Sequence, residues 1–406
     1  MTFHIIEGGV TAAKGFQASG IHCGIRKNRS KADLALIYSD VPCAAAAVYT
    51  QNLVKGAPIA VTKRNIADGM ARAVICNSGN ANTCNADGEE KAQKMCDLIA
   101  AELHIDASDV IVASTGVIGQ VLPIEPIANS VKTLAEALSA TGSNDAAKAI
   151  MTTDTVQKEV AVEFLLDGKK CRLGGMAKGS GMIHPNMATT LNFITTDVAI
   201  SGEMIQAALS EIVKVTYNCL SIDGDTSTND MVSVMANGLA GNAEITEKNA
   251  DFDLFKKALY VVMENMTKML AADGEGASKF LECSCDGAPD QETAIVVAKS
   301  VIRSPLFKCA MFGEDANWGR ILCAIGYAEA EFDIDKVAVE LESEVGTVAV
   351  CKNGAGVAFS EEEAAKILNK DEIYIHVHLN QGEASAKAWG CDLTYDYVKI
   401  NGDYRS

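Results

Sequence analysis

A glycine-rich stretch lies between a predicted hairpin and a predicted strand: Gly174-Gly-Met-Ala-Lys-Gly-Ser-Gly-Met-Ile-His-Pro-Asn-Met-Ala-Thr-Thr-Leu191. Glycines permit positive φ angles and let backbone N–H groups converge on an anion. The order of a phosphate-binding Walker loop is absent, because Lys178 precedes Gly179. Nor is this a Gly-x-Ser-x-Gly nucleophile elbow, because Lys178 and Met182 flank Ser180 at the glycine positions. The local sequence alone supports a structural loop and a functional site equally.

Strands are predicted on both sides of this stretch. Val160–Leu166 and Lys169–Leu173 flank Asp167-Gly168, a strong signal for a two-residue hairpin. Thr190–Asp197 follows as a strand of mixed face. Further short or alternating strands are predicted at 73–76, 110–113, 337–341, 347–351, 373–379 and 386–393.

Helices are predicted where apolar residues recur at helical spacing. One of them begins at Ser201, a capping residue, and has Glu203 in its first turn. The predicted helices span residues 88–104, 124–138, 201–215, 253–272, 291–303, 319–328 and 361–368. Helices and strands alternate irregularly, which favours an α+β fold with layered sheets over a doubly wound parallel sheet.

Composition describes an ordinary globular chain with a strong acidic excess. The 406 residues predict two domains or one large layered unit. The net charge of −18 argues against nucleic acid and anionic membranes as partners. We see no secretory signal and no run of about 18 apolar residues, so a cytoplasmic location is expected. The 13 cysteines form no framework and are expected to be reduced thiols.

No metal site is predicted. His376 and His378 alternate within one predicted strand and share a face, as a satisfied or exposed pair does. Ser221–Asp230 superficially resembles a calcium loop. However, Thr228 stands where the turn glycine belongs and Val234 where the bidentate glutamate belongs, which excludes calcium.

Other dense polar segments are candidates for pocket walls. Ala113–Val117 follows a predicted strand, and hydroxyls with a glycine amide at a strand end suit an oxyanion site. They equally suit a turn that ends the strand. Three more such segments are 76–82, 150–155 and 313–320. For 76–82 and 313–320, turns with Asx hydrogen bonds are the other interpretation.

These motifs together resemble one family. Lys178–Thr189 is similar to the processing site of ornithine acetyltransferases, also called glutamate N-acetyltransferases of arginine biosynthesis. Seven more motifs match the same family in the same order: 77–82, 114–116, 152–155, 221–230, 273–276, 313–320 and 397–406. The resemblance therefore covers nearly the whole chain, and the ordered set is highly specific although each motif alone is weak.

The resemblance implies a fold and a maturation step. The fold is a layered αββα sandwich resembling N-terminal nucleophile hydrolases, with a smaller C-terminal α/β part. The precursor is expected to cleave itself between Ala188 and Thr189. The alpha chain, 1–188, and the beta chain, 189–406, are expected to stay together and to pair into a heterotetramer.

The implied nucleophile makes chemical sense. A threonine hydroxyl is a weak nucleophile until a base removes its proton. Once Thr189 is N-terminal, its own α-amine can be that base, because an α-amine has a pKa of roughly 7.7–8.0. An internal amide nitrogen is not basic, so cleavage must come first. No histidine is needed.

The resemblance also assigns the remaining site residues. Thr115 and Gly116 would form the oxyanion hole, by a hydroxyl and a backbone N–H. Lys178 would neutralise an α-carboxylate, and Glu275 would accept hydrogen bonds from the ornithine side-chain ammonium. The full set of implied substrate contacts is Thr152, Lys178, Thr189, Glu275, Asn401 and Ser406. No cofactor is implied.

The expected reaction is a ping-pong transfer of acetyl from N-acetylornithine to glutamate. Acetyl-CoA stays open as a further donor, since no residue decides it by a physical argument. A self-processing amidase or aminopeptidase, with water as the acceptor, is the second interpretation. A third is a non-enzymatic protein that binds an anion at the glycine-rich loop and tolerates Thr189→Ala.

Overall fold

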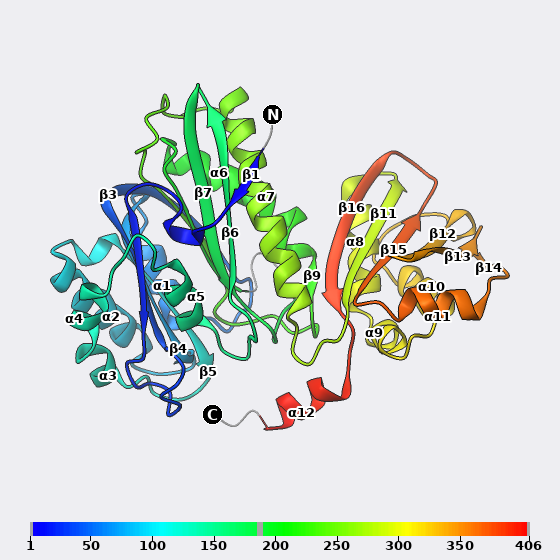
Figure 1. Ribbon diagram of the computed structural model, residues 1–406, viewed down its shortest axis with the longest axis horizontal. Helices are drawn as coiled ribbons and strands as arrows, with labels where there is room; N and C mark the ends of the chain where they lie inside the picture. The colour runs from blue at the N-terminus through cyan, green and yellow to red at the C-terminus, as the bar shows by residue number, and fades with distance from the viewer. Residues whose placement is uncertain (1–2, 185–189, 404–406) are drawn as a thin grey trace.

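The computed structural model describes residues 3–184 and 190–403, which form two lobes (Figure 1). The strands of the first lobe are β1 (His4–Ile6), β2 (Phe16–Ile21), β3 (Leu34–Tyr49), β4 (Met70–Asn80), β5 (Val110–Val117), β6 (Lys158–Leu166), β7 (Lys169–Lys178), β8 (Leu191–Thr196) and β10 (Met231–Ala236). Its helices are α1 (Ala57–Asn65), α2 (Gly88–Leu103), α3 (Ile124–Ala128), α4 (Val131–Glu136), α5 (Ser143–Ile150), α6 (Gly202–Val215) and α7 (Ala250–Ala272).

The long strand β3 joins two halves of one sheet. Its first half pairs with β2 and β4, and its second half pairs with β10. The register between β3 and β4 is irregular between Tyr38 and Cys43, where the strand changes partners. A buried cluster contains Ile37 of the first half together with Phe193 and Met235 of the second. The two halves therefore pack face to face.

Helices cover both outer faces of this pair of half-sheets. Leu36 and Ile75 pack in one cluster with Ile99 of α2. On the other side, strands β6, β7, β8 and β10 share a cluster with α6 and α7, including Leu209 and Met266. The layers are thus helix, sheet, sheet, helix, which confirms the predicted α+β class and its αββα order.

The second lobe is a smaller α/β unit. Its strands are β9 (Leu220–Ser221), β11 (Phe280–Ala288), β12 (Ala338–Ser343), β13 (Gly346–Lys352), β14 (Ala355–Gly356), β15 (Glu372–His378) and β16 (Ala384–Cys391). Its helices are α8 (Gln291–Arg303), α9 (Pro305–Phe312), α10 (Trp318–Gly326), α11 (Glu361–Leu368) and α12 (Tyr395–Asp403). The strand order is β14-β13-β12-β15-β11-β16-β9. In Figure 1, α12 leaves this lobe and turns back toward the first.

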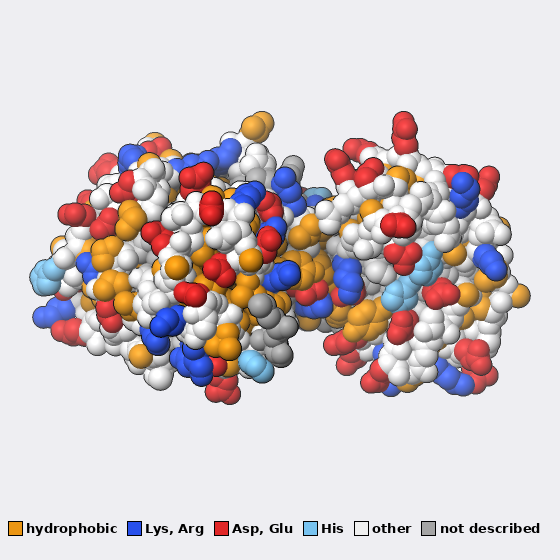
Figure 2. All heavy atoms as spheres, turned by 90° about the horizontal axis from the view of Figure 1, so that it is seen from above, with side chains coloured by type: hydrophobic (Ala, Val, Ile, Leu, Met, Phe, Trp, Pro, Cys, Tyr) orange, Lys and Arg blue, Asp and Glu red, His pale blue; other side chains and the backbone are white. Residues whose placement is uncertain are grey.

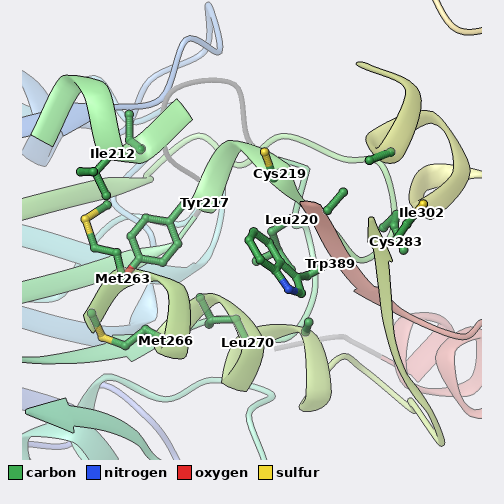
Figure 3. Close-up of a cluster of buried hydrophobic side chains, with 14 of the residues drawn as sticks. Ile212, Tyr217, Cys219, Leu220, Met263, Met266, Leu270, Cys283, Ile302 and Trp389 are labelled. Atoms are coloured by element: carbon green, nitrogen blue, oxygen red, sulfur yellow. The ribbon is translucent and has the colours of Figure 1, made fainter. Parts of the chain in front are cut away.

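The two lobes share a hydrophobic core. Trp389 of β16 is fully buried, and Figure 3 shows it beside Leu220 and Leu270, the latter on α7. Its indole Nε1 donates to Oε2 of Glu282 at 2.8 Å. Because a buried indole N–H needs an acceptor, this bond fixes the ring within the second lobe, and the packing of the ring beside Leu270 of α7 joins that lobe to the first.

The secondary structure matches most predicted elements, with one correction. Residues 124–138, predicted as a single helix, form the two short helices α3 and α4. The helix is interrupted at Asn129 and Ser130, residue types whose side chains compete with helical backbone hydrogen bonds. The hairpin at Asp167-Gly168 is confirmed, with positive φ angles of 49° and 67° as a type I′ turn requires.

The predicted histidine pair is confirmed as a satisfied one. Nε2 of His376 lies 2.6 Å from Glu342, and Nδ1 of His378 lies 2.8 Å from Asp286.

Figure 2 shows Asp and Glu side chains scattered over both lobes. Across residues 3–184 and 190–403, no helix is both long and apolar enough to span a bilayer.

Candidate active site

A pocket opens where β5 and β7 end, between the two half-sheets. Its lining comes from segments that are far apart in the sequence. They are Ala81, Thr115, Gly116, Ile118, Thr152, Thr153, Lys178, Gly181, Met182, Ser227, Thr228, Asn229, Glu275 and Asn401. Both half-sheets, the loop after α7 and α12 of the second lobe therefore contribute to one site.

The structure brings the described members of the predicted site together in this pocket. They are Thr115, Gly116, Thr152, Lys178, Glu275 and Asn401. The remaining predicted residues, Ala188, Thr189 and Ser406, lie outside the described residues.

Thr115 and Gly116 lie at the carboxyl end of β5. This strand runs parallel to β4, with Gly116 directly opposite Gly79. Gly116 has a φ of +127°, and a Cβ atom there would lie 2.4 Å from the carbonyl carbon of Gly79. Only glycine fits this position, so the backbone that reaches the pocket here is fixed by the close approach of two strands.

Lys178 reaches from one half-sheet to the other. It is the last residue of β7, and its Nζ lies 3.4 Å from Oγ1 of Thr115 on β5. Its side chain is largely buried. Burial lowers the pKa of Lys178, and the nearby carboxylate of Asp154 acts in the opposite direction. A buried cation in a polar pocket suits the binding of a carboxylate.

Glu275 and Asn401 form the opposite wall. Nδ2 of Asn401, on α12, donates to Oε2 of Glu275 at 2.7 Å. The backbone N–H of Glu275 donates to the carbonyl of Ser180 at 2.9 Å. A side chain at Gly181 would collide with the Glu275 carboxylate. The absence of a side chain at Gly181 therefore lets this carboxylate approach the glycine-rich stretch closely.

Helix α12 is held by polar contacts at the pocket. None of its residues is buried. The hydroxyl of Tyr397 donates to Oδ2 of Asp223 at 3.2 Å. Asp223 also accepts the backbone N–H groups of Met182 and Ile183, at 2.6 and 2.9 Å. One carboxylate thus connects α12 to the segment that leads into residues 185–189.

Asn229 is a site residue that the motif analysis left without a role. Its Nδ2 donates to the carbonyls of Ala81 and Ser114 at 2.6 and 2.9 Å, and its Oδ1 accepts from Thr83. It therefore joins the ends of β4 and β5 to the segment before β10. The dense run of polar residues at 221–230 was the only sequence signal for it.

Histidine plays no visible part in the pocket. Burial lowers the pKa of His184 to about 4, so the ring is neutral near pH 7. Its Nδ1 lies 3.0 Å from Oγ of Ser221. No histidine occurs among the described residues that line the pocket. A catalytic base for this site must therefore be a group other than histidine.

A hydroxyl and a glycine amide at a strand end, beside a buried lysine, define a site of the acyl-transfer class. The sequence matches the ArgJ family over residues 17–406. The chain belongs to the ArgJ family, which confirms the family predicted from the ordered motifs.

Two relatives match this chain over almost its full length. The chain is 50% identical over 398 residues to the arginine biosynthesis bifunctional protein ArgJ 1 of Clostridium acetobutylicum, covering 98% of this chain and 97% of that protein. It is 47% identical over 403 residues to the arginine biosynthesis bifunctional protein ArgJ of Bacillus subtilis, covering 99% of this chain and 97% of that protein. The solved structure of an ornithine acetyltransferase complexed with ornithine, from Mycobacterium tuberculosis, is 38% identical with a TM-score of 0.43, covering 46% of this chain and 100% of that chain.

Proposed function

We propose that this protein moves an acetyl group from N-acetylornithine to glutamate, in arginine biosynthesis, through an acetyl ester on Thr189. The observation that carries the proposal is the meeting of five separate segments, each with a residue of the expected type, in one pocket. Hydroxyl, amide, ammonium and carboxylate groups are then all available to a substrate that is itself an amino acid.

In the proposed cycle, Thr189 Oγ attacks the acetyl carbonyl while the α-amine of Thr189 takes the hydroxyl proton. The oxyanion accepts hydrogen bonds from Thr115 Oγ1 and Gly116 N–H. The amide C–N bond breaks, the proton passes to the leaving nitrogen, and ornithine departs. The amine of glutamate then attacks the ester, its proton returns by the same base, and N-acetylglutamate leaves with Thr189 restored.

Binding of the donor follows from the charges of the pocket. Lys178 pairs with the α-carboxylate of N-acetylornithine. The carboxylate of Glu275 accepts a hydrogen bond from the ammonium at the donor's other amino group. Asn401 orients the Glu275 carboxylate through its 2.7 Å hydrogen bond. Thr152 and Ser406 complete the polar contacts.

The proposed maturation cuts the chain between Ala188 and Thr189, into 1–188 and 189–406. The strand order supports two chains that stay together. β7, from the first chain, pairs antiparallel with β8 of the second, and Lys178 lies opposite Leu191. β10 of the second chain then pairs with β3 of the first. Each chain alone would expose unpaired strands, so the two remain associated, and two such pairs assemble into a heterotetramer.

The test of the transfer reaction compares two products. The purified protein is incubated with N-acetylornithine and glutamate, and N-acetylglutamate and free acetate are measured. N-acetylglutamate is expected to form faster than acetate. Acetate alone would mean that water is the acceptor and that the protein is an amidase. A parallel reaction with acetyl-CoA and glutamate decides whether acetyl-CoA is also a donor.

The test of maturation is the intact mass under denaturing conditions. Active protein is expected to give two fragments that meet at Ala188 and Thr189. Active protein that remains a single 42.8 kDa species would contradict the mechanism.

A further inference from the structure

A buried ion network lies directly behind the pocket. Nζ of Lys158 lies 2.7 Å from Oδ1 of Asp154 and 2.6 Å from Oδ2 of Asp273. The side chains of Lys158 and Asp154 are fully buried, and that of Asp273 is 8% exposed. Charges this deeply buried are costly unless every one is paired. None of the three lines the pocket, so the mechanism above does not use them.

Asp154 holds two of the pocket segments. Its Oδ2 accepts the backbone N–H of Thr152 at 3.0 Å, and its Oδ1 accepts the N–H of Gly179 at 2.7 Å. Thr152 is a proposed substrate contact, and Gly179 directly follows Lys178. One carboxylate therefore fixes the backbone beside both groups that would meet the donor.

Asp273 holds the wall that carries Glu275. Its Oδ2 accepts the N–H of Thr155 at 3.0 Å, and its carbonyl accepts from Oγ of Ser180 at 2.6 Å. Ser180 in turn accepts the N–H of Glu275. Through Lys158, the network thus spans the segment after α5, the central glycine-rich stretch and the loop after α7.

Several charged and polar groups surround Lys178. Lys178 faces Asp154 and Lys158 from one side, Asp230 from the start of β10, and Cys76 and Thr115 from β4 and β5. Burial by itself raises the pKa of Asp154, but Lys158 and Lys178 outweigh it and lower that pKa to about 2. Asp154 is therefore a carboxylate at every working pH. Burial raises the pKa of Asp230 well above its usual range, and Lys178 acts in the opposite direction.

We infer that Asp154 is a positioning residue for donor binding, which acts through Lys178 and Thr152, and that Lys158 serves to hold Asp154 in place. This inference rests on the proposed function, in which Lys178 receives the substrate carboxylate. Asp154 favours the cationic form of Lys178 and holds the backbone N–H of Thr152 at the pocket wall. Lys158 balances the negative charge of Asp154, which would otherwise be left in the core.

Two variants separate this role from a merely structural one. Asp154→Asn keeps the shape and one acceptor oxygen but leaves the two buried ammonium groups of Lys158 and Lys178 with Asp273 as the remaining carboxylate of the network. Asp154→Asn combined with Lys158→Met removes one charge of each sign, and Asp273 keeps its hydrogen bonds from the backbone N–H and the hydroxyl of Thr155. Removing two opposite charges together restores stability when a buried ion pair is only structural. We expect the double variant to recover thermal stability while its KM for N-acetylornithine stays raised by about tenfold, the loss of one charge-assisted contact, with a smaller change in kcat.

A pH profile gives the second readout. Without Asp154, Lys178 loses its proton at lower pH, so the alkaline limb of kcat/KM for N-acetylornithine should move down by about one pH unit. The matched control is Glu282→Gln, which removes another buried carboxylate, paired with Lys387 at 2.7 Å in the second lobe. Glu282→Gln should lower the stability of the fold and leave the alkaline limb of kcat/KM at its wild-type pH.

Chemical labelling of lysine amines, followed by mass spectrometry across pH, tests the same point without substrate. Lys178 should react at lower pH in the Asp154 variants than in the wild type. Recovery of both KM and stability in the double variant, or unchanged labelling of Lys178, would overturn the inference. If the wild type were inactive while the labelling of Lys178 was still shifted in the Asp154 variants, the proposed function would be contradicted. The effect of Asp154 on Lys178 would still stand.

Discussion

The ammonium of Lys178 lies 3.4 Å from the hydroxyl of Thr115, across the gap between two half-sheets that the chain reaches at very different points. Lys178 ends β7 and Thr115 lies near the end of β5. The contact places a cation beside the group proposed to stabilise an oxyanion. The pocket is therefore a product of the αββα packing and not of any one loop.

Thr115 is expected to act mainly on the chemical step. Thr115→Val keeps the shape of the side chain and removes the hydroxyl, so kcat should fall by about 10²–10³, the usual effect of losing one oxyanion donor. KM for N-acetylornithine should change little. Thr115→Ser retains the hydroxyl and should keep most of the activity. Equal losses in both variants, measured by steady-state kinetics, would argue against a role for the hydroxyl.

Thr189 and Thr190 are adjacent hydroxyl residues that should behave oppositely. Thr189→Ala removes both the nucleophile and its cleavage chemistry, so denatured mass spectra should show an intact chain and transfer should be lost. Thr190→Ala leaves the proposed scissile bond intact and should give two fragments and an active protein. Processing in the Thr189 variant, or its absence in the Thr190 variant, would place the nucleophile elsewhere.

Asn401 is expected to affect donor binding without affecting the stability of the fold. Its helix α12 buries no residue, and its amide donates to Glu275. Asn401→Ala should raise KM for N-acetylornithine by about tenfold, since a hydrogen bond to a charged group is lost. The melting temperature should stay nearly unchanged. Val398→Ala, at a position on the same helix that is 68% exposed, is the control and should alter neither quantity.

The Asp154 carboxylate predicts a specific acid sensitivity. Its pKa falls from 3.8 in the unfolded chain to about 2 in the fold, because the nearby ammonium groups outweigh the opposing effect of burial. A lowered folded-state pKa contributes stability above pH 3.8, and this contribution is lost as the pH falls toward 2. Thermal melts at pH 5 and pH 3 should therefore differ less for the Asp154→Asn, Lys158→Met variant than for the wild type. Equal pH dependence in the two proteins would contradict this assignment.

Local patterns predicted some elements well and missed others for identifiable reasons. The capped helix α6 and the hairpin at Asp167-Gly168 follow from short-range signals and are confirmed. Strand β3 was not predicted, because Pro42 and the alanines at 44–47 are poor strand formers. Its pairing with β2, β4 and β10 outweighs that preference, and Pro42 lies in the irregular segment where the strand changes partners.

The site was less accessible to pattern analysis than the fold. Thr115, Lys178 and Glu275 are far apart along the chain, and no spacing rule relates them. Only the ordered set of family motifs placed them in one site, and their shared pocket supports that assignment. The role of Lys158 could not be predicted from family motifs. In the sequence it is an ordinary lysine before a predicted strand, and its burial between two carboxylates depends on three-dimensional packing.

The pairing of β7 with β8 has a consequence for how the mature molecule is made. If the bond before Thr189 breaks, neighbouring strands of one sheet belong to separate polypeptides, and the short link that brought Lys178 and Leu191 together is gone. Assembly from denatured halves would then require an encounter between two molecules, so its yield would depend on concentration. The intact precursor has no such requirement. Each molecule would therefore fold once, before cleavage, and refolding after cleavage would be inefficient.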